Sequence, residues 1–238
     1  MAKEMETLFE VPIGAEGKVV CLRPADKVYV LQFTSPPDNR LVTVTTLPHG
    51  VVITTSGIPK FYSNGLDLEH ANWTPGFFGD SLYALWRRLL TYPMPTIALM
   101  NGHAFAGALM TAMMHDYRIM NPHRGYLCLN EVELGTYRTL VLEGKRFKAL
   151  DALKENIIDG VGGLDEALTY TREMRLVSKP DKGVYGALKR EMWRETVSFL
   201  ENWDEESGKE IRAELARQRE SKDREAKVKS WEANKAKL

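Results

Sequence analysis

The stretch PTIALMNGHAFAGALMTAMMHDYRIM, residues Pro95–Met120, limits what this chain can fold into more than any other segment. From Thr96 to Met114 almost every residue is apolar or small, and this run is nearly as long as the roughly 20 apolar residues that a membrane-spanning helix needs. Asn101, His103 and two glycines interrupt it, however, and these residues exclude a membrane span. The pattern instead predicts a buried strand, a turn of small residues and a helix, followed by a short strand over Asp116–Met120.

The glycines of this stretch do not form a familiar phosphate-binding loop. No Gly-Lys-Ser/Thr follows them, and the segment GVGGLD at Gly160 lacks the third glycine of a dinucleotide-binding fingerprint. The sequence also contains neither a Gly-x-Ser-x-Gly elbow nor a His-Glu-x-x-His helix. Its five histidines are scattered, which gives no support for a metal site.

The turn at Ala106, Gly107 and Ala108 has two interpretations. Small residues permit tight packing between a strand and a helix, and these residues alone favour that interpretation. They would also let a substrate carbonyl approach the backbone closely. The first N–H groups of a helix have no partner within the helix, so they would stabilise an oxygen that becomes negative during a reaction.

Strands and helices alternate along the rest of the chain. The predicted elements are strands at Lys27–Phe33 and Gly50–Gly57, a helix between Gly79 and Pro93, two helices within 136–162 and a helix at Leu164–Ser178. This alternation predicts an α/β fold with parallel strands. We expect a core at residues 1–178 and a C-terminal helical region at 179–238. Charges of both signs mix in its tail, which is typical of a solvated helix.

Charge and cysteine content narrow the partners and the compartment. Lys+Arg and Asp+Glu both number 32, so the formal net charge is zero, which argues against a nucleic-acid or anionic-membrane partner. Cys21 and Cys128 are far apart, which favours a reduced compartment. The N-terminus lacks a continuous apolar core, so no secretory signal is predicted. The final residues Ala236, Lys237 and Leu238 are a variant of the peroxisomal address Ser-Lys-Leu, although a lysine-rich tail can also end this way by chance.

Two further segments contain candidate site residues. In KFYSNGLDLEHA, Gly65 allows a sharp turn after which Leu66 can present its N–H to a ligand. The alternative is a plain Asn-Gly turn with Asp67 capping a helix. In YLCLNEVELG, Glu131 lies inside an apolar segment, where a carboxylate is either partnered or has a raised pKa suited to proton transfer. Its alternative is an exposed glutamate on an irregular edge.

The segments FYSNGLDL, NGHAFAGALMTAMMHDYRIM and LNEVELG occur in this order and together resemble the crotonase superfamily, the enoyl-CoA hydratase/isomerase group. The resemblance covers roughly residues 28–161 and implies a core built as a spiral of ββα repeats. It also implies that the backbone N–H groups of Leu66 and Gly107 hold the thioester oxygen of an acyl-CoA. The neighbouring residues expected to contact substrate are Ser63, Asn64, Gly65, Asp67 and Ala106.

The resemblance further implies the type of reaction. Hydratases of this superfamily use two glutamates, and Met110 stands where the first would be, while Glu131 stands at the second. The pattern is therefore similar to that of Δ3,Δ2-enoyl-CoA isomerases, in which one glutamate moves a proton from C2 to C4. No metal or redox cofactor is expected, since coenzyme A is part of the substrate. The expected setting is peroxisomal oxidation of unsaturated fatty acids, with an import receptor as a partner and a homo-oligomer, either a trimer or a hexamer.

The chain is shorter than the family pattern in two places, near Leu41–Leu47 and at Gly135–Thr136, so two family helices are expected to be absent. The acyl pocket of the family is lined partly by the second segment, and chain-length preference is therefore not predicted. Two alternatives to the isomerase remain open: hydratase-type activity, which Met110 disfavours, and a non-catalytic homologue that binds acyl-CoA.

Overall fold

The computed structural model describes residues 5–13, 17–34, 49–129, 144–203, 205, 208–209, 216–222 and 224. The chain divides into two compact units, Met1–Arg194 and Glu195–Leu238. The core boundary expected at residue 178 stays a prediction. The shortened segments near Leu41–Leu47 and Gly135–Thr136 lie outside the described residues.

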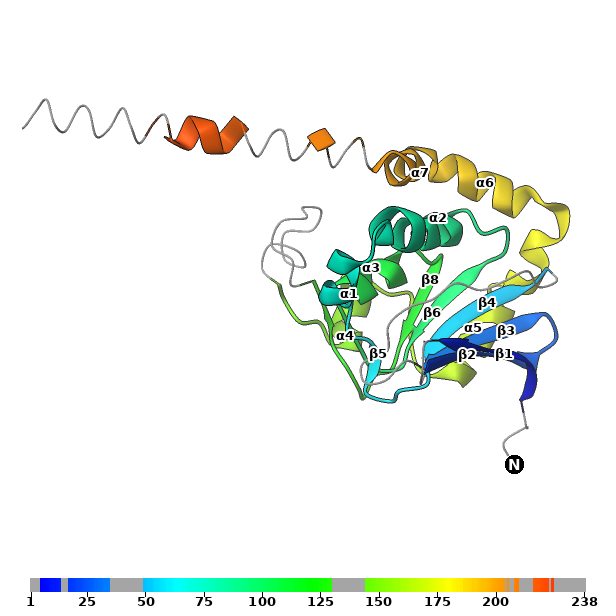
Figure 1. The fold of residues 1–238 in the computed structure, drawn as a ribbon. Coiled ribbons are helices and arrows are strands. Elements are labelled where there is room, and N and C mark those ends of the chain that lie inside the picture. Colours follow the sequence, from blue (N-terminus) through cyan, green and yellow to red (C-terminus); the bar gives the residue numbers. More distant parts are fainter. Residues whose placement is uncertain are drawn as a thin grey trace, which may run out of the picture. The chain divides into compact units, whose positions relative to one another are not determined.

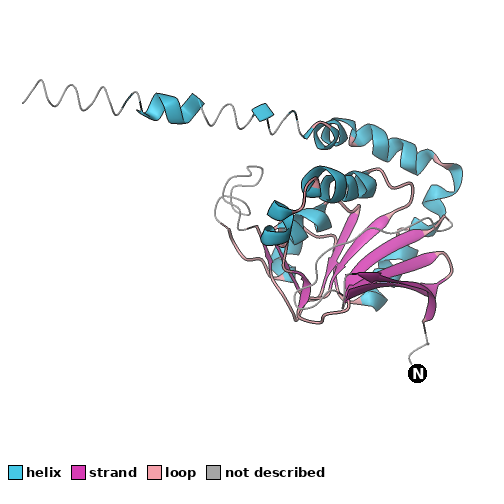
Figure 2. Ribbon diagram, viewed as in Figure 1, coloured by secondary structure: helices cyan, strands magenta, loops and turns pink. Residues whose placement is uncertain are grey.

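A mixed seven-stranded sheet forms the centre of the first unit (Figures 1 and 2). In spatial order its strands are β1 (Glu6–Ile13), β2 (Gly17–Ala25), β3 (Val28–Thr34), β4 (Val51–Ser56), β6 (Thr96–Met100), β8 (Tyr117–Met120) and β10 (Gly160–Val161). The first three pair antiparallel, and all pairs from β3 to β10 are parallel. The predicted α/β fold with parallel strands is thus confirmed, with an antiparallel extension at one edge.

The parallel strands follow from continuous apolar and β-branched sequence. Strand β6, TIALM, is buried at every position, as expected for a strand covered on both faces. Strands β1 and β2 were not predicted, because their charged residues hide the alternation of apolar and polar positions along them. Lys18 and Glu10 form an ion pair across this hairpin, as do Arg23 and Glu6. Such residues line the exposed face of an antiparallel edge.

A second, three-stranded sheet places the two candidate turns. It consists of β5 (Phe61–Ser63), β7 (His103–Phe105) and β9 (Leu127–Cys128), in that order and all parallel. Neighbouring parallel strands end at the same edge of a sheet. The turn after β5, which contains Leu66, and the turn after β7, which contains Gly107, therefore leave the sheet side by side.

The helices mostly follow the predicted segments. Their bounds are α1 (Leu68–Trp73), the π-helix η1 (Phe77–Tyr83), α2 (Ala84–Leu90), α3 (Gly107–Met113), α4 (Ala149–Lys154), α5 (Leu164–Glu173), the 3₁₀-helix η3 (Leu176–Lys182), α6 (Val184–Met192) and α7 (Arg194–Glu201). Of the two helices predicted within 136–162, α4 lies in the described part, and residues 136–143 lie outside it. Described residues include no helix long and apolar enough to cross a membrane.

Apolar cores lie on both faces of the large sheet. Along β6, Ala98 and Met100 belong to a cluster that includes Leu109 of α3, whereas Ile97 and Leu99 belong to a second cluster that includes Ala167 of α5. Side chains alternate between the faces of a strand, so one short segment contributes to both cores. We call these the α3 face and the α5 face of the sheet (Figure 1).

A buried ion pair attaches α6 to the core. Lys189 is 4% exposed, and its Nζ lies 2.8 Å from Asp116 Oδ2 and 3.0 Å from the carbonyl oxygen of Leu89. Burial lowers the pKa of Lys189, while the neighbouring Asp116 carboxylate opposes that shift. The sequence did not predict a buried lysine at this position. A lysine is retained in the interior only when a carboxylate and further acceptors satisfy it.

Candidate active site

Two turns from distant parts of the sequence meet at the edge of the small sheet. Gly65 has φ of +100°, a conformation that favours glycine. A Cβ atom at Gly65 would lie 3.1 Å from the Phe105 carbonyl oxygen, 3.2 Å from Ala106 Cβ and 3.6 Å from the Gly107 nitrogen. Glycine at position 65 thus allows the first turn to pass directly against the backbone of the second.

Gly107 is also required by this close approach. A Cβ atom at Gly107 would lie 2.9 Å from Cγ of Leu66, closer than real side-chain carbons come. The preceding residue, Ala106, has φ of 53° and ψ of −129°, which is an uncommon and strained conformation for a residue with a side chain. Its N–H donates to the Cys128 carbonyl at 2.9 Å, and its carbonyl accepts from the Met110 N–H at 3.1 Å. These bonds hold Ala106 in place.

The N–H groups of Leu66 and Gly107 are available to a ligand as far as the described residues extend. Neither donates a hydrogen bond to another described residue. The N–H of Gly65, by contrast, donates to the Ser63 hydroxyl at 3.2 Å. Buried backbone N–H groups are normally paired, so two donors at one corner with no partner among the described residues are an arrangement that could bind an oxygen.

The other predicted contacts have local structural partners. Ser63 is fully buried beneath the turn that its hydroxyl stabilises. Asn64 is exposed. Asp67 is the N-cap of α1 and accepts from the His70 N–H at 3.1 Å, as the alternative interpretation of this segment required. Roles of Ser63, Asn64, Gly65, Asp67 and Ala106 in substrate binding stay predictions. Glu131 and the terminal residues Ala236, Lys237 and Leu238 lie outside the described residues.

A network of buried polar side chains lies behind this corner, on the α3 face. Thr54 Oγ1 lies 3.0 Å from the Tyr62 hydroxyl and 2.9 Å from His115 Nε2. His115 Nδ1 lies 3.0 Å from the Thr111 carbonyl oxygen. A carbonyl only accepts, so Nδ1 carries a proton. In a neutral ring Nε2 then accepts from Thr54, and Thr54 in turn accepts from Tyr62.

Burial keeps this histidine neutral. His115 is 5% exposed, and desolvation lowers its pKa to about 4, outweighing the hydrogen bond to Thr111 and the nearby Asp116 carboxylate, which both act to raise it. Burial likewise raises the pKa of Tyr62 to about 12. Both side chains therefore act at neutral pH as uncharged hydrogen-bonding groups.

The network continues from Thr111 to the candidate corner itself. The Thr111 hydroxyl donates to the Gly107 carbonyl at 2.7 Å and accepts from Trp86 Nε1–H at 2.8 Å. Sequence reasoning did not identify Thr54, Thr111 or His115 as related residues. The one signal in the sequence was His115, which ends a long apolar run. Its hydrogen-bond partners could not be read from the sequence, because Thr54 lies on β4 and is far from α3 in the chain.

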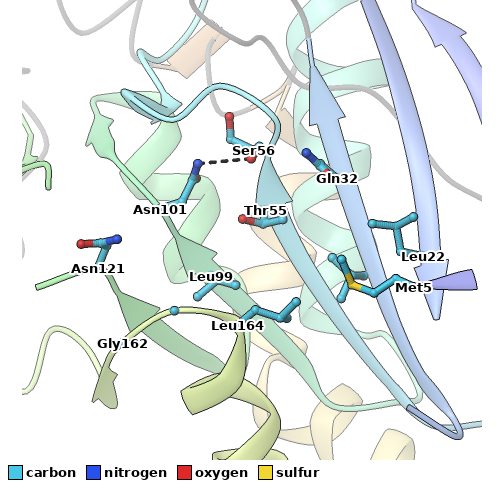
Figure 3. Close-up of a pocket in the computed structure, with 12 residues that line it drawn as sticks. Met5, Leu22, Gln32, Thr55, Ser56, Leu99, Asn101, Asn121, Gly162 and Leu164 are labelled. Carbon is cyan, nitrogen blue, oxygen red and sulfur yellow. Dashed lines mark hydrogen bonds between the residues drawn. The ribbon is translucent and has the colours of Figure 1, made fainter. Parts of the chain in front are cut away.

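A separate small cavity of about 210 Å³ lies on the α5 face. Figure 3 shows the residues that line it, which include Gln32, Thr55, Leu99, Asn101 and Leu164. The amide nitrogen of Asn101 donates to the carbonyl oxygens of Ser56 and Ile58, whereas its buried Oδ1 has no partner among the described residues. The cavity includes neither Leu66 nor Gly107 and is therefore distinct from the candidate corner.

The described residues contain no cluster of three or more His, Cys, Asp or Glu side chains that could hold a metal ion. The expectation that no cofactor is needed stays a prediction.

Solved structures share this architecture. A probable enoyl-CoA hydratase of Mycobacterium tuberculosis superposes with a TM-score of 0.64 at 18% identity, covering 83% of this chain and 99% of that one. An enoyl-CoA hydratase of Thermoplasma volcanium superposes with a TM-score of 0.58 at 19% identity, covering 78% of this chain and 89% of that one. The fold is thus that of the crotonase class, as the sequence motifs predicted.

Sequence comparison identifies the family to which the chain belongs. The family described as "Enoyl-CoA hydratase/isomerase" matches residues 45–142. Enoyl-CoA delta isomerase 3 of Arabidopsis thaliana is 32% identical over 184 residues, which are 64% of this chain and 77% of that protein. The peroxisomal enoyl-CoA delta isomerase 2 of the same plant is 29% identical, over 63% of this chain and 77% of its own length. The chain belongs to the enoyl-CoA hydratase/isomerase family.

Proposed function

We propose that this protein is a Δ3,Δ2-enoyl-CoA isomerase, which converts 3-enoyl-CoA to trans-2-enoyl-CoA. The observation that carries the proposal is the pair of turns that brings the Leu66 and Gly107 N–H groups to one edge of the small sheet, where neither donates to a described residue. In the proposed complex both N–H groups donate to the thioester oxygen. Preorganised donors of this kind stabilise the negative charge that develops on that oxygen.

Glu131 is the proposed acid and base. As a carboxylate it removes a proton from C2 of the substrate, and the electron pair moves onto the thioester oxygen to form an enolate. The protonated carboxyl then returns the proton at C4, and the double bond is left between C2 and C3. Strand β9, which ends three residues before Glu131 in the sequence, lies beside β7, from which the Gly107 turn leaves. This topology supports the assignment.

Met110 favours isomerisation over hydration. It lies in the first turn of α3, is partly buried and packs against the apolar cluster of the α3 face. A thioether has no proton to exchange at neutral pH, whereas adding water to an alkene calls for one group to activate the water and another to handle the second proton. With Met110 at this position, Glu131 alone would move the proton.

A peroxisomal role in the oxidation of unsaturated fatty acids is part of the proposal. Its support is the C-terminal Ala236-Lys237-Leu238 together with the peroxisomal relative at 29% identity. Deleting these three residues is expected to prevent import by the peroxisomal receptor. Unchanged import of the truncated protein would contradict the proposed peroxisomal location.

Assembly as a homo-oligomer is also proposed, and light scattering of the purified protein would test it.

The test of activity compares two neighbouring glutamates. Wild-type protein is expected to form 2-enoyl-CoA from 3-enoyl-CoA substrates of several chain lengths, with Glu131→Gln lowering kcat by at least about 10³-fold because it removes the only proposed proton carrier. The control Glu133→Gln is expected to stay within about threefold of wild type. Full activity of Glu131→Gln would overturn the assignment of Glu131 as the acid and base.

The same assay separates the alternative functions. Rapid formation of 3-hydroxyacyl-CoA would favour the hydratase. Binding of acyl-CoA with no turnover at high enzyme concentration would favour the non-catalytic homologue. Either result would overturn the proposed isomerase.

A further inference from the structure

A continuous set of buried hydrogen bonds connects the two turns of the candidate site. At one end, Tyr62 lies on β5, four residues before Leu66. At the other end, Thr111 binds the carbonyl of Gly107. Thr54 and His115 join the two ends through the contacts described above, at 3.0, 2.9 and 3.0 Å. We refer to Thr54, Tyr62, Trp86, Thr111 and His115 as the polar network.

Thr111 is where the parts of this network meet. Its hydroxyl oxygen accepts from Trp86 and donates to Gly107, so both the proton and an acceptor position of the hydroxyl are used. Its backbone carbonyl accepts from His115 Nδ1. Thr111 therefore contacts the turn that carries the Gly107 N–H. Through His115 and Thr54 it is also connected to Tyr62 on β5, the strand that precedes the Leu66 N–H.

The surroundings of the network are apolar, so it is not a solvent-facing patch. Ala98, Met100, Leu109 and Ala112 of the same face are all fully buried. Tyr62, Trp86, Thr111 and His115 are buried, and Thr54 is partly buried. Burying polar side chains is unfavourable unless each is hydrogen-bonded, whereas a satisfied network favours a single arrangement. Apolar packing alone would tolerate small sliding between α3 and β5. Directional bonds restrict that sliding, and a misplacement of about 1 Å can cost roughly 10²-fold in rate.

We propose that Thr111 is a positioning residue, which through the polar network fixes the spacing between the Leu66 and Gly107 N–H groups. This inference rests on the proposed function, because it assigns these two N–H groups to the thioester oxygen. It goes beyond that function by naming residues that touch neither substrate nor proton and yet determine how well the transition state is bound.

The α5 face supplies a closely matched control. Thr171 of α5 is 1% exposed, as Thr111 is, and its hydroxyl donates to the carbonyl four residues earlier, Ala167, at 2.8 Å. Thr111 makes the same bond to Gly107 at 2.7 Å. Replacing either residue by valine removes a buried hydroxyl of the same kind. Only Thr111→Val removes bonds of the polar network, those to the Gly107 carbonyl and from Trp86 Nε1–H, while the Thr111 backbone carbonyl still accepts from His115.

The kinetic test uses Thr111→Val, Thr111→Ser and Thr171→Val in the full-length protein. We expect Thr111→Val to lower kcat for 3-enoyl-CoA about tenfold while KM changes less than about threefold, because the donors would be misplaced mainly for the enolate-like state. Thr111→Ser restores the hydroxyl and is expected to recover kcat to within about threefold. Thr171→Val is expected to keep wild-type kcat, whatever it does to Tm. Equal kcat for the two valine variants would overturn the inference.

A second measurement does not depend on turnover. Backbone amide NMR signals of Leu66 and Gly107 are expected to shift in Thr111→Val and to stay in place in Thr171→Val. An unmoved Leu66 signal in Thr111→Val would overturn the inference even where the isomerase is confirmed. An inactive wild-type protein in which both signals shift would instead overturn the proposed function and leave the coupling of the turns established. If Thr111→Val does not fold, Thr54→Val interrupts the network at its other end, and a shift of the Gly107 signal is then expected.

Discussion

Helices α3 and α5 start on opposite faces of one sheet, and their N-cap N–H groups have different kinds of partner. At α5, the N–H of the N-cap Gly163 donates to the Glu166 side chain of the same helix at 2.6 Å, whereas at α3 the N–H of the N-cap Ala106 donates to the Cys128 carbonyl of β9 at 2.9 Å. The bond from Gly163, together with the N–H of Glu166 itself, lowers the pKa of the Glu166 carboxyl. At α3, the N-cap Ala106 has no side chain able to cap, and the Gly107 N–H donates to no described residue.

The difference shows where each helix places its polar groups. The α5 terminus follows the ordinary rule that a nearby side chain caps a helix, and its face of the sheet buries few polar groups. At α3, the N-cap N–H is paired with a neighbouring strand, the N-cap residue Ala106 has a positive φ, and the polar network lies behind the terminus. Backbone strain of this kind is often found at functional sites.

The largest expected effect comes from closing the space at the α3 terminus. In Gly107→Ala the new Cβ would meet Leu66 at 2.9 Å and push the two N–H groups apart. We expect kcat for 3-enoyl-CoA to fall about 10²- to 10³-fold, the usual cost of losing one such donor. At α5, a Cβ at Gly163 would meet only Glu166 Oε2 at 3.6 Å, so Gly163→Ala is expected to stay within about twofold.

A double variant sharpens this prediction. Leu66→Ala removes the atoms that a Cβ at Gly107 would contact while keeping the Leu66 backbone N–H. The double variant Leu66→Ala/Gly107→Ala is therefore expected to be at least about tenfold more active than Gly107→Ala. If the double variant recovers nothing, steric contact between the turns is not the cause of the loss.

A smaller effect is expected on the pH dependence of stability, again only on the α3 face. The folded-state pKa of His115 is lowered to about 4 from 6.5, so the unfolded chain binds the proton more tightly. Stability is unaffected by this group above pH 6.5, falls as the pH drops from 6.5 to 4 and then levels off. The difference between these two pKa values of His115 corresponds to about 3 kcal/mol of stability.

Denaturant unfolding across this pH window tests the assignment. His115→Asn is expected to be less stable than wild type at pH 7 but to lose about 3 kcal/mol less on acidification. Charged groups near His115 are Asp116, Lys189 and Arg118, and they are present in both proteins. Parallel stability curves for the two proteins would show that the pKa of His115 in the folded state is not lowered, and would contradict the assignment.

The smallest expected effect is on thermal stability, and it compares the strained backbone of Ala106 with the relaxed backbone of Gly163. Ala106 has a positive φ of 53°, so Ala106→Gly is expected to raise the free energy of unfolding by up to about 1 kcal/mol after the entropic cost of glycine is subtracted. Gly163 has a φ of −108°, which alanine adopts readily, so Gly163→Ala is expected to be neutral or slightly stabilising. Thermal unfolding of both variants measures these changes in stability. A loss of stability in Ala106→Gly would contradict the proposal that the backbone of Ala106 is strained.

Most of the architecture was predictable because it follows from local pattern. The apolar runs at Gly50–Gly57 and Pro95–Gly102 became β4 and β6, and the small-residue turn at Ala106–Ala108 became the start of α3. Strands β1 and β2 were not predicted, since charged residues paired across the hairpin hide their period. The buried Lys189 was not predicted either, because its partner Asp116 is 73 residues away.

By itself the sequence determined the family motifs, the alternation of strands and helices after residue 27, and the glycines that the two turns require. These are local properties, set by side-chain size, backbone freedom and apolar period. Only the tertiary structure decided that Gly65 and Leu66 lie against Gly107, since the parallel pairing of β5 with β7 brings their ends to the same edge. It also decided that Thr54, Thr111 and His115 share one network, because hydrogen bonds between distant segments depend on how the helix packs on the sheet.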